Sequence, residues 1–201
     1  MELFLLAGLV IIAAWMLKSR DQRRRVALLG GYLANYQIEK HMETLTQGYL
    51  RALGAGDPER SEPIWSMLRS TEQELCSQFK RFAADFSRAT EAETRVSRLP
   101  IYIPFATRLF PGISFDARQA LAIHARGISR AAQGDGLSSP KEMAFTMTAE
   151  LFLMQHTSHW FCKSKTVASA RMFALHKTPY AQLVASVGPA TRDAYCALVQ
   201  G

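Results

Sequence analysis

The sequence is poor in cysteine, and its few cysteines form no recognisable framework. Cys76, Cys162 and Cys196 are scattered, odd in number and make no Cys-x-x-Cys pair. Small disulfide-stapled domains carry an even set of cysteines, and structural zinc sites use closely spaced pairs. We therefore expect reduced thiols, as in a cytoplasmic compartment, and neither a disulfide scaffold nor a zinc module.

Motifs that specify a reaction are missing as well. The chain has no glycine-rich phosphate loop, no nucleophile elbow and no His-Glu-x-x-His sequence, each of which sets defined groups around a substrate or a metal. It also has no internal repeat and no low-complexity tract. The sequence therefore assigns no catalytic residue, no cofactor and no metal ion, and an enzyme is the less favoured functional class.

Long hydrophobic runs are scarce, and the one that is present opens the chain. Residues 3–17 are 15 consecutive apolar residues. As a helix they measure about 22 Å, whereas a comfortable span needs about 20 residues to cross a hydrocarbon core of roughly 30 Å. Met1 and the long stems of Lys18 and Arg20 can extend the buried length. The run predicts a transmembrane anchor at residues 1–17. A cleaved signal peptide fits poorly, because no Ala-x-Ala motif precedes Lys18 and the first residues carry no positive charge.

A basic flank follows this run immediately. Only Asp21 opposes the five cations, which are Lys18, Arg20, Arg23, Arg24 and Arg25. By the positive-inside rule such a flank stays in the cytoplasm. We therefore expect a signal anchor, N-out and C-in. A compact anchored chain without a transit or signal segment favours the inner membrane of a bacterium.

Positive charge is unevenly distributed along the rest of the chain. The net charge of +7 is the sum of +3 for residues 1–25, −3 for residues 26–93 and +7 for residues 94–201. For a chain held at a membrane, the simplest acidic partner is anionic lipid, worth about 1 kcal/mol per Lys or Arg near the surface. Nucleic acid is the second choice.

Acidic residues are also absent from residues 95–113, a segment that mixes aliphatic and aromatic residues with Arg95, Arg98 and Arg108. Its three prolines exclude one regular helix. One interpretation is an ordered connector whose apolar side chains cover the core. The other is an interfacial segment that dips Ile101, Tyr102, Ile103 and Phe105 among lipid headgroups, with its arginines on phosphates.

The remaining patterns predict an all-α protein: a transmembrane helix that continues into a cytoplasmic domain of about five to six helices. Residues 18–53 contain no proline and form a basic juxtamembrane segment and helix. Gly30-Gly31 indicates either a kink or the close packing of a neighbouring helix. A break at 54–58 opens a helical domain at residues 54–201. Its first helix shows the clearest face, formed by Ile64, Leu68, Leu75, Phe79, Phe82 and Phe86.

Two further helix starts are predicted from capping residues. Ser114 is expected to cap the next helix, whose inner face includes His124 at its edge. Ser139, followed by Pro140 and Glu142, forms a capping box for a helix that is apolar nearly all round. We expect that helix to be the central buried element, since the polar residues within it would be costly in lipid.

The same central helix holds the one constellation that could carry chemistry. His156 and His159 can share a face, Cys162 follows three residues later, and Glu150 lies upstream. The spacing is weak evidence for a metal site, because steps of three rotate each side chain by about 60° around the helix. The ordinary alternative is a set of buried polar groups that are hydrogen-bonded to neighbouring helices.

These patterns predict a single-pass membrane protein whose helical domain binds or scaffolds near an anionic membrane surface. The expected partners are membrane lipids and another protein. Two alternatives stay open: a membrane-tethered nucleic-acid binder, and a helical metal-dependent or acid/base enzyme that uses His156 and His159. The predicted surface contacts are Lys18, Arg20, Arg23, Arg24, Arg25, Arg95, Arg98, Arg108, Lys163 and Lys165.

Overall fold

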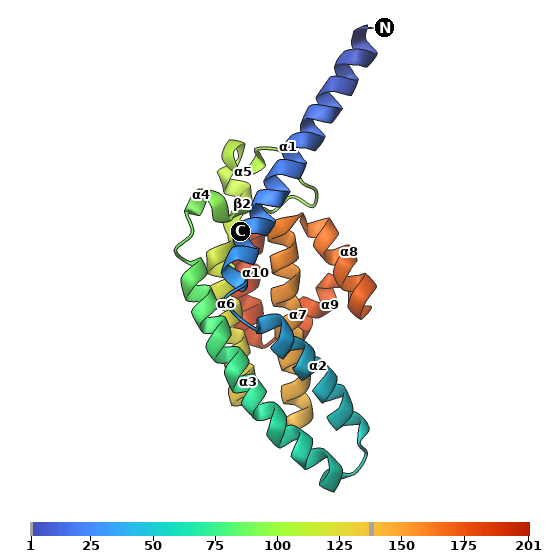
Figure 1. Ribbon diagram of the computed structural model, residues 1–201, viewed down its shortest axis with the longest axis vertical. Coiled ribbons are helices and arrows are strands. Elements are labelled where there is room, and N and C mark those ends of the chain that lie inside the picture. Colours follow the sequence, from blue (N-terminus) through green and yellow to red (C-terminus); the bar gives the residue numbers. More distant parts are fainter. Residues whose placement is uncertain (1, 137–138) are drawn as a thin grey trace.

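The computed structural model describes residues 2–136 and 139–201 and confirms the all-α fold class (Figure 1). Its long helices are α1 (Glu2–Leu33), α2 (Ile38–Gly54), α3 (Pro58–Phe86), α6 (Ala117–Gln133), α7 (Pro140–Cys162), α8 (Lys165–His176) and α10 (Pro189–Gln200). The shorter elements are α4 (Glu91–Thr94), β1 (Arg95–Ser97), α5 (Ala106–Leu109), the 3-10 turn η1 (Pro111–Ile113), β2 (Ser114–Asp116) and α9 (Tyr180–Ser186). After α1, the described part thus holds six helices of 12 residues or more, besides three short ones.

Helix α1 has two parts with different surroundings. Its amino-terminal half projects alone beyond the other helices, whereas its last turns lie against them (Figure 1). Leu29 is buried, and Leu28, Tyr32 and Leu33 pack on the core. The helix is therefore docked on the body only through its carboxyl-terminal half.

No helix in the described part of the chain is both long enough and apolar enough to cross a membrane. The prediction of a transmembrane anchor at residues 1–17 is therefore not supported. The physical reason is length, because Lys18 ends the apolar run after 15 residues, where about 20 are needed. Met1 itself lies outside the described residues.

The predicted kink at Gly30-Gly31 is wrong in position. Helix α1 continues through both glycines to Leu33, and the chain turns at residues 34–37. The Gln78 side chain accepts a hydrogen bond from the Gln37 backbone N–H at 2.7 Å, which fixes this turn on α3. Helix α2 then packs along α3 over its whole length (Figure 1).

Helix α3 has the buried aromatic face that the sequence predicts. Phe79, Phe82 and Phe86 are at most 1% exposed, and their rings contact one another in sequence. The helix begins at Pro58, directly after Asp57, which caps it by accepting the Glu59 N–H at 3.0 Å. The core of the body is therefore built on α3 and the helices that cover this face.

Helix α7 is the central buried helix, as predicted. It packs against α6, α8 and α9 and also touches α1 and α2. Ser139 caps it through the Glu142 N–H at 3.2 Å. The predicted cap at Ser114 is wrong: Ser114 lies in β2, and Asp116 caps α6 by accepting the Arg118 N–H at 2.9 Å.

A two-stranded ribbon, which the sequence analysis did not predict, interrupts the helices. Strands β1 and β2 pair antiparallel, with Val96 opposite Phe115. The Trp160 indole donates a hydrogen bond to the Ser97 carbonyl at 3.0 Å, and its ring meets Phe115 edge-on. The ribbon thereby holds the intervening segment, residues 98–113, at the end of the body from which α1 projects (Figure 1).

Candidate functional site

The predicted chemical constellation on α7 does not assemble into a metal site. Among the described residues, no group of three His, Cys, Asp or Glu side chains could hold a metal ion. His156 is buried, stacks on the Tyr180 ring at 4.5 Å between centroids and shares a hydrogen bond with the Ser169 hydroxyl at 3.0 Å. Burial lowers the pKa of His156 to about 3, so this imidazole is neutral at pH 7.

The other members of that constellation have separate surroundings. The Glu150 carboxylate faces the start of α10 and accepts the Gly188 N–H at 3.1 Å. Burial raises the pKa of the half-buried Cys162 thiol to about 11, so the thiol is protonated and unreactive as a nucleophile at pH 7. Burial likewise lowers the pKa of His159.

A buried polar network that the sequence analysis did not identify joins α6, α7 and α10. The Thr157 hydroxyl lies 2.9 Å from the His124 ring nitrogen Nε2 and 3.2 Å from the Tyr195 hydroxyl. Burial lowers the pKa of His124 to about 3, which makes it a neutral core residue. This network gives His124 Nε2, Thr157 and Tyr195 partners in the core, as the ordinary interpretation of buried polar residues expects, whereas the buried His124 Nδ1 has no partner among the described residues.

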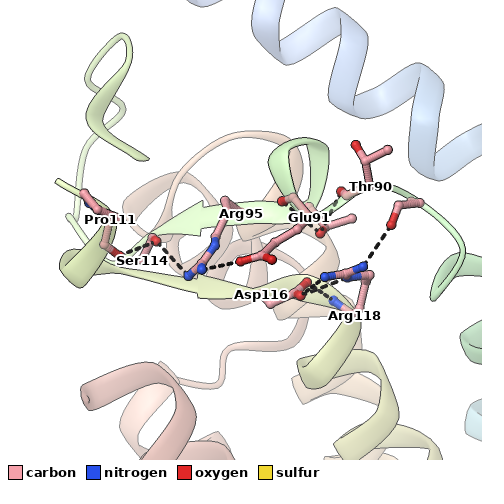
Figure 2. Close-up of polar contacts among 9 residues, drawn as sticks. Thr90, Glu91, Arg95, Pro111, Ser114, Asp116 and Arg118 are labelled. Carbon is pink, nitrogen blue, oxygen red and sulfur yellow. Dashed lines mark hydrogen bonds and ion pairs between the residues drawn. The ribbon is translucent and has the colours of Figure 1, made fainter. Parts of the chain in front are cut away.

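Polar side chains clamp the β-ribbon to the helices around it. Figure 2 shows Arg95 between Glu91, with which it forms an ion pair, and Ser114, whose hydroxyl oxygen lies 3.3 Å from the guanidinium. Arg118 forms an ion pair with Asp116 at 2.6 Å and donates to the Ala89 carbonyl at 3.0 Å. Burial alone would raise the pKa of Asp116, but the bonds from Arg118 outweigh it and lower the pKa.

These charges surround a cavity of about 310 Å³ beside the ribbon. Arg98, which also lines it, donates to the backbone carbonyls of Gly112 at 3.0 Å and Leu198 at 2.9 Å. The arginines of this cavity therefore hold the ribbon and the carboxyl-terminal helix together. Their role in the fold is positional: they fix where residues 98–113 lie.

A larger cavity of about 480 Å³ lies between α1 and the segment that the ribbon holds. One wall is the middle of α1, from Leu17 to Leu28. The opposite wall is the stretch 101–108, and Trp160 and Lys163 from the end of α7 also line it. In Figure 1 this stretch, which includes most of α5, lies beside α1 where α1 leaves the body.

Arg25 fixes the base of this cavity. Its side chain is only 15% exposed and forms an ion pair with Asp21 at 2.8 Å. It also donates to the backbone carbonyls of Arg95 at 3.0 Å and Phe161 at 3.3 Å, with the guanidinium 5.4 Å from the Phe161 ring centroid. One side chain of the basic flank thereby links α1 to β1 and α7.

Tyr102 reaches the same region from the opposite wall. Burial and the neighbouring Asp21 carboxylate raise the pKa of Tyr102 to about 12. A second ion pair joins Arg24 to Glu93 at 2.8 Å. The wall itself is held in place by Pro100, whose carbonyl accepts the Thr166 N–H at 3.0 Å.

The predicted surface contacts therefore divide into three groups. Arg20, Arg24, Arg25, Arg108 and Lys163 line the larger cavity. Arg95 and Arg98 make the contacts within the body described above, and the Lys165 ammonium lies over the Trp160 and Tyr180 rings at 5.2 and 5.0 Å. Lys18 and Arg23 are exposed on α1 and are not among the lining residues.

Comparison of the chain with protein-family models, with curated proteins and with solved structures finds no match.

Proposed function

We propose that the protein is a membrane-attached helical module, which inserts the apolar half of α1 into lipid and holds its body at an anionic membrane surface. The observation that carries the proposal is the exposure of this half. Phe4 is 83% exposed and Trp15 is 66% exposed, and the large apolar residues between them are exposed as well. An apolar surface of this extent marks a lipid or protein contact.

Lipid is the better match because the apolar surface surrounds the helix. A helix that packs on one protein partner presents an apolar stripe and keeps a polar opposite face. Residues 3–17 leave no polar face, and a bilayer is a solvent that covers every side. The cations that follow at Lys18 and Arg20 suit the headgroup layer.

The segment opposite α1 supports the same placement. Ile101, Ile103, Phe105, Leu109 and Phe110 are all large apolar side chains with at least 44% exposure, so they do not cover the core as an ordered connector would. They lie at the end of the body from which α1 projects (Figure 1). Insertion of α1 would therefore bring them to the lipid surface.

The proposed orientation of the protein across the membrane follows from the positive charge of residues 18–25. The basic flank and the body stay on the cytoplasmic side, at the inner membrane of a bacterium, where anionic lipids attract Lys and Arg. Binding or scaffolding of another protein near the bilayer is the role that such an attachment would serve.

The proposal is tested by binding of the full chain to neutral phosphatidylcholine vesicles in a flotation assay. Ile11→Asp places a charge in the middle of the apolar run at a cost of about 3 kcal/mol, so partitioning should fall by at least about 100-fold. Leu50→Asp is the matched control, because Leu50 is 73% exposed on α2 in the body. Equal flotation of the Ile11→Asp variant and the unmodified protein would refute insertion of α1.

A second binding experiment, with nucleic acid in place of vesicles, tests the alternative that the protein is a nucleic-acid binder. If nucleic acid were the partner, the chain would be retained on it without lipid, and retention would fall steeply with salt. We expect no such retention, because the apolar residues 3–17 that precede the cations of α1 suit lipid and not nucleic acid.

A further inference from the structure

The larger cavity combines positive charge with incomplete neutralisation. Five cationic side chains line it, against the two carboxylates of Asp21 and Glu93. Those carboxylates pair with Arg25 and Arg24. Arg20, Arg108 and Lys163 form no ion pair with any residue in 2–136 or 139–201. The cavity is therefore complementary to an anion.

The walls of the cavity are apolar as well as cationic. Ile101, Ile103 and Phe105 line the cavity and are exposed on its outer wall, and Leu17 stands opposite on α1. A small inorganic anion would use only the cationic part of this lining. An anion that carries hydrocarbon uses both parts.

The position of the cavity along α1 indicates which amphiphile fits. It begins at Leu17 and Arg20, the point at which the apolar run meets the basic flank. A lipid whose acyl chains lie beside the apolar half of α1 has its phosphate at this level. Guanidinium groups bind phosphate through paired, charge-assisted hydrogen bonds, and a volume of about 480 Å³ falls within the usual range of small-molecule sites.

We propose that this cavity, which we call the headgroup pocket, binds the phosphate of an anionic phospholipid between α1 and residues 101–108. Arg20 and Arg108 hold the phosphate from the two walls, with Lys163 as a third cation. The proposal rests on the function proposed above, because insertion of α1 is what delivers the acyl chains to this level. It goes further by assigning one specific site and a preference for an anionic headgroup.

The test measures binding of short-chain phosphatidylglycerol to the full chain in non-ionic micelles by calorimetry. Binding should be saturable, and the double variant Arg20→Gln/Arg108→Gln should lower the affinity at least about tenfold, because two charge-assisted contacts are lost. The control is Arg23→Gln/Arg126→Gln, which removes the same charge from two exposed arginines that do not line the pocket. It should change the affinity less than about twofold. Circular dichroism of both variants verifies that each is folded.

Two further ligands separate a lipid from a free phosphate. Short-chain phosphatidylcholine tests the need for net negative charge, and glycerol phosphate tests the need for acyl chains. We expect both to bind more weakly than phosphatidylglycerol. If glycerol phosphate binds as tightly as the lipid, the assignment to lipid is overturned. If both double variants lower the affinity for phosphatidylglycerol equally, the effect comes from general surface charge and the headgroup pocket is refuted.

Failure of this inference is distinguishable from failure of the proposed function. Flotation with neutral vesicles depends on the apolar half of α1 and not on the pocket. If the chain floats with neutral vesicles but shows no saturable phosphatidylglycerol binding, only the inference of the headgroup pocket is refuted. If the chain does not float, the proposed membrane attachment itself is refuted.

Discussion

Glu150 offers a sharp test of how the body is packed. Its side chain is 1% exposed between α6, α7 and the start of α10. Burial raises its pKa from 4.5 to about 7, while a bond from the Thr191 hydroxyl, the Gly188 N–H and the charge of Arg130 oppose the rise. The folded protein therefore keeps this carboxyl protonated at pH values where the unfolded chain has released the proton.

The sign of the pH dependence follows from this difference. Between pH 4.5 and 7 the folded state binds one more proton at Glu150 than the unfolded state, so stability falls as pH rises, by about 1.4 kcal/mol per pH unit. The loss totals about 3 kcal/mol once pH passes the folded pKa of about 7. Glu150→Gln replaces the carboxyl with a neutral group of the same shape, whose oxygen can still accept the Gly188 N–H.

The stability difference between Glu150→Gln and the unmodified protein should therefore grow by about 3 kcal/mol from pH 4.5 to pH 8, in favour of the variant. Urea unfolding of the full chain in non-ionic detergent, followed by circular dichroism, measures it. Burial lowers the pKa of His124 and His156, which reduces stability in acid, but this effect is common to both proteins and cancels. Glu39→Gln, at an exposed position of α2, is the control. A difference that stays constant across this range would refute the buried, protonated Glu150.

Two further substitutions test the core. Phe82→Ala should destabilise the body by about 3 to 5 kcal/mol in the same urea assay, because Phe82 is 1% exposed among other aromatic rings; a loss under about 1 kcal/mol would mean that this face of α3 is not a core face. Gly127→Ala should lower the melting temperature by several degrees, because the new Cβ would lie 2.3 Å from a Glu150 carboxyl oxygen and 2.4 Å from the Thr191 hydroxyl. Gly31→Ala is the control, since a Cβ at that position meets nothing within 4 Å.

Local patterns predicted the parts of the fold that local physics determines. The apolar face of α3 repeats at helical spacing, and Ser139 with Pro140 marks the start of α7. The β-ribbon could not be predicted in this way, because three-residue strands carry no periodicity and depend on pairing across the 16 residues of chain that separate them. That pairing also explains the error at Ser114. Ser114 and Asp116 are both good cap residues, and the strand occupies Ser114 before the helix begins.

The candidate site was predictable in charge but not in geometry. The basic flank and Arg108 stand out in the sequence because the flank has five cations against the single acid Asp21, and residues 95–113 contain no acid. Distant partners decide which cations face a cavity and which hold the fold together: Arg95 contacts Ser114, and Arg98 contacts the carbonyl of Leu198. No local pattern encodes such contacts. The transmembrane prediction rested on a run five residues shorter than the roughly 20 that a span needs.

The way in which α1 is docked connects the exposed helix with the headgroup pocket. Arg25, nearly buried, fixes the base of α1 to the carbonyls of Arg95 and Phe161, and Arg24 adds an ion pair to Glu93. A helix held at its base in this way has a defined direction relative to the body. The proposed insertion of its tip into lipid would therefore fix the orientation of the body as well, and would turn the end that carries residues 101–110 toward the membrane. In that orientation, the cations between those two surfaces would lie at the depth of the lipid phosphates.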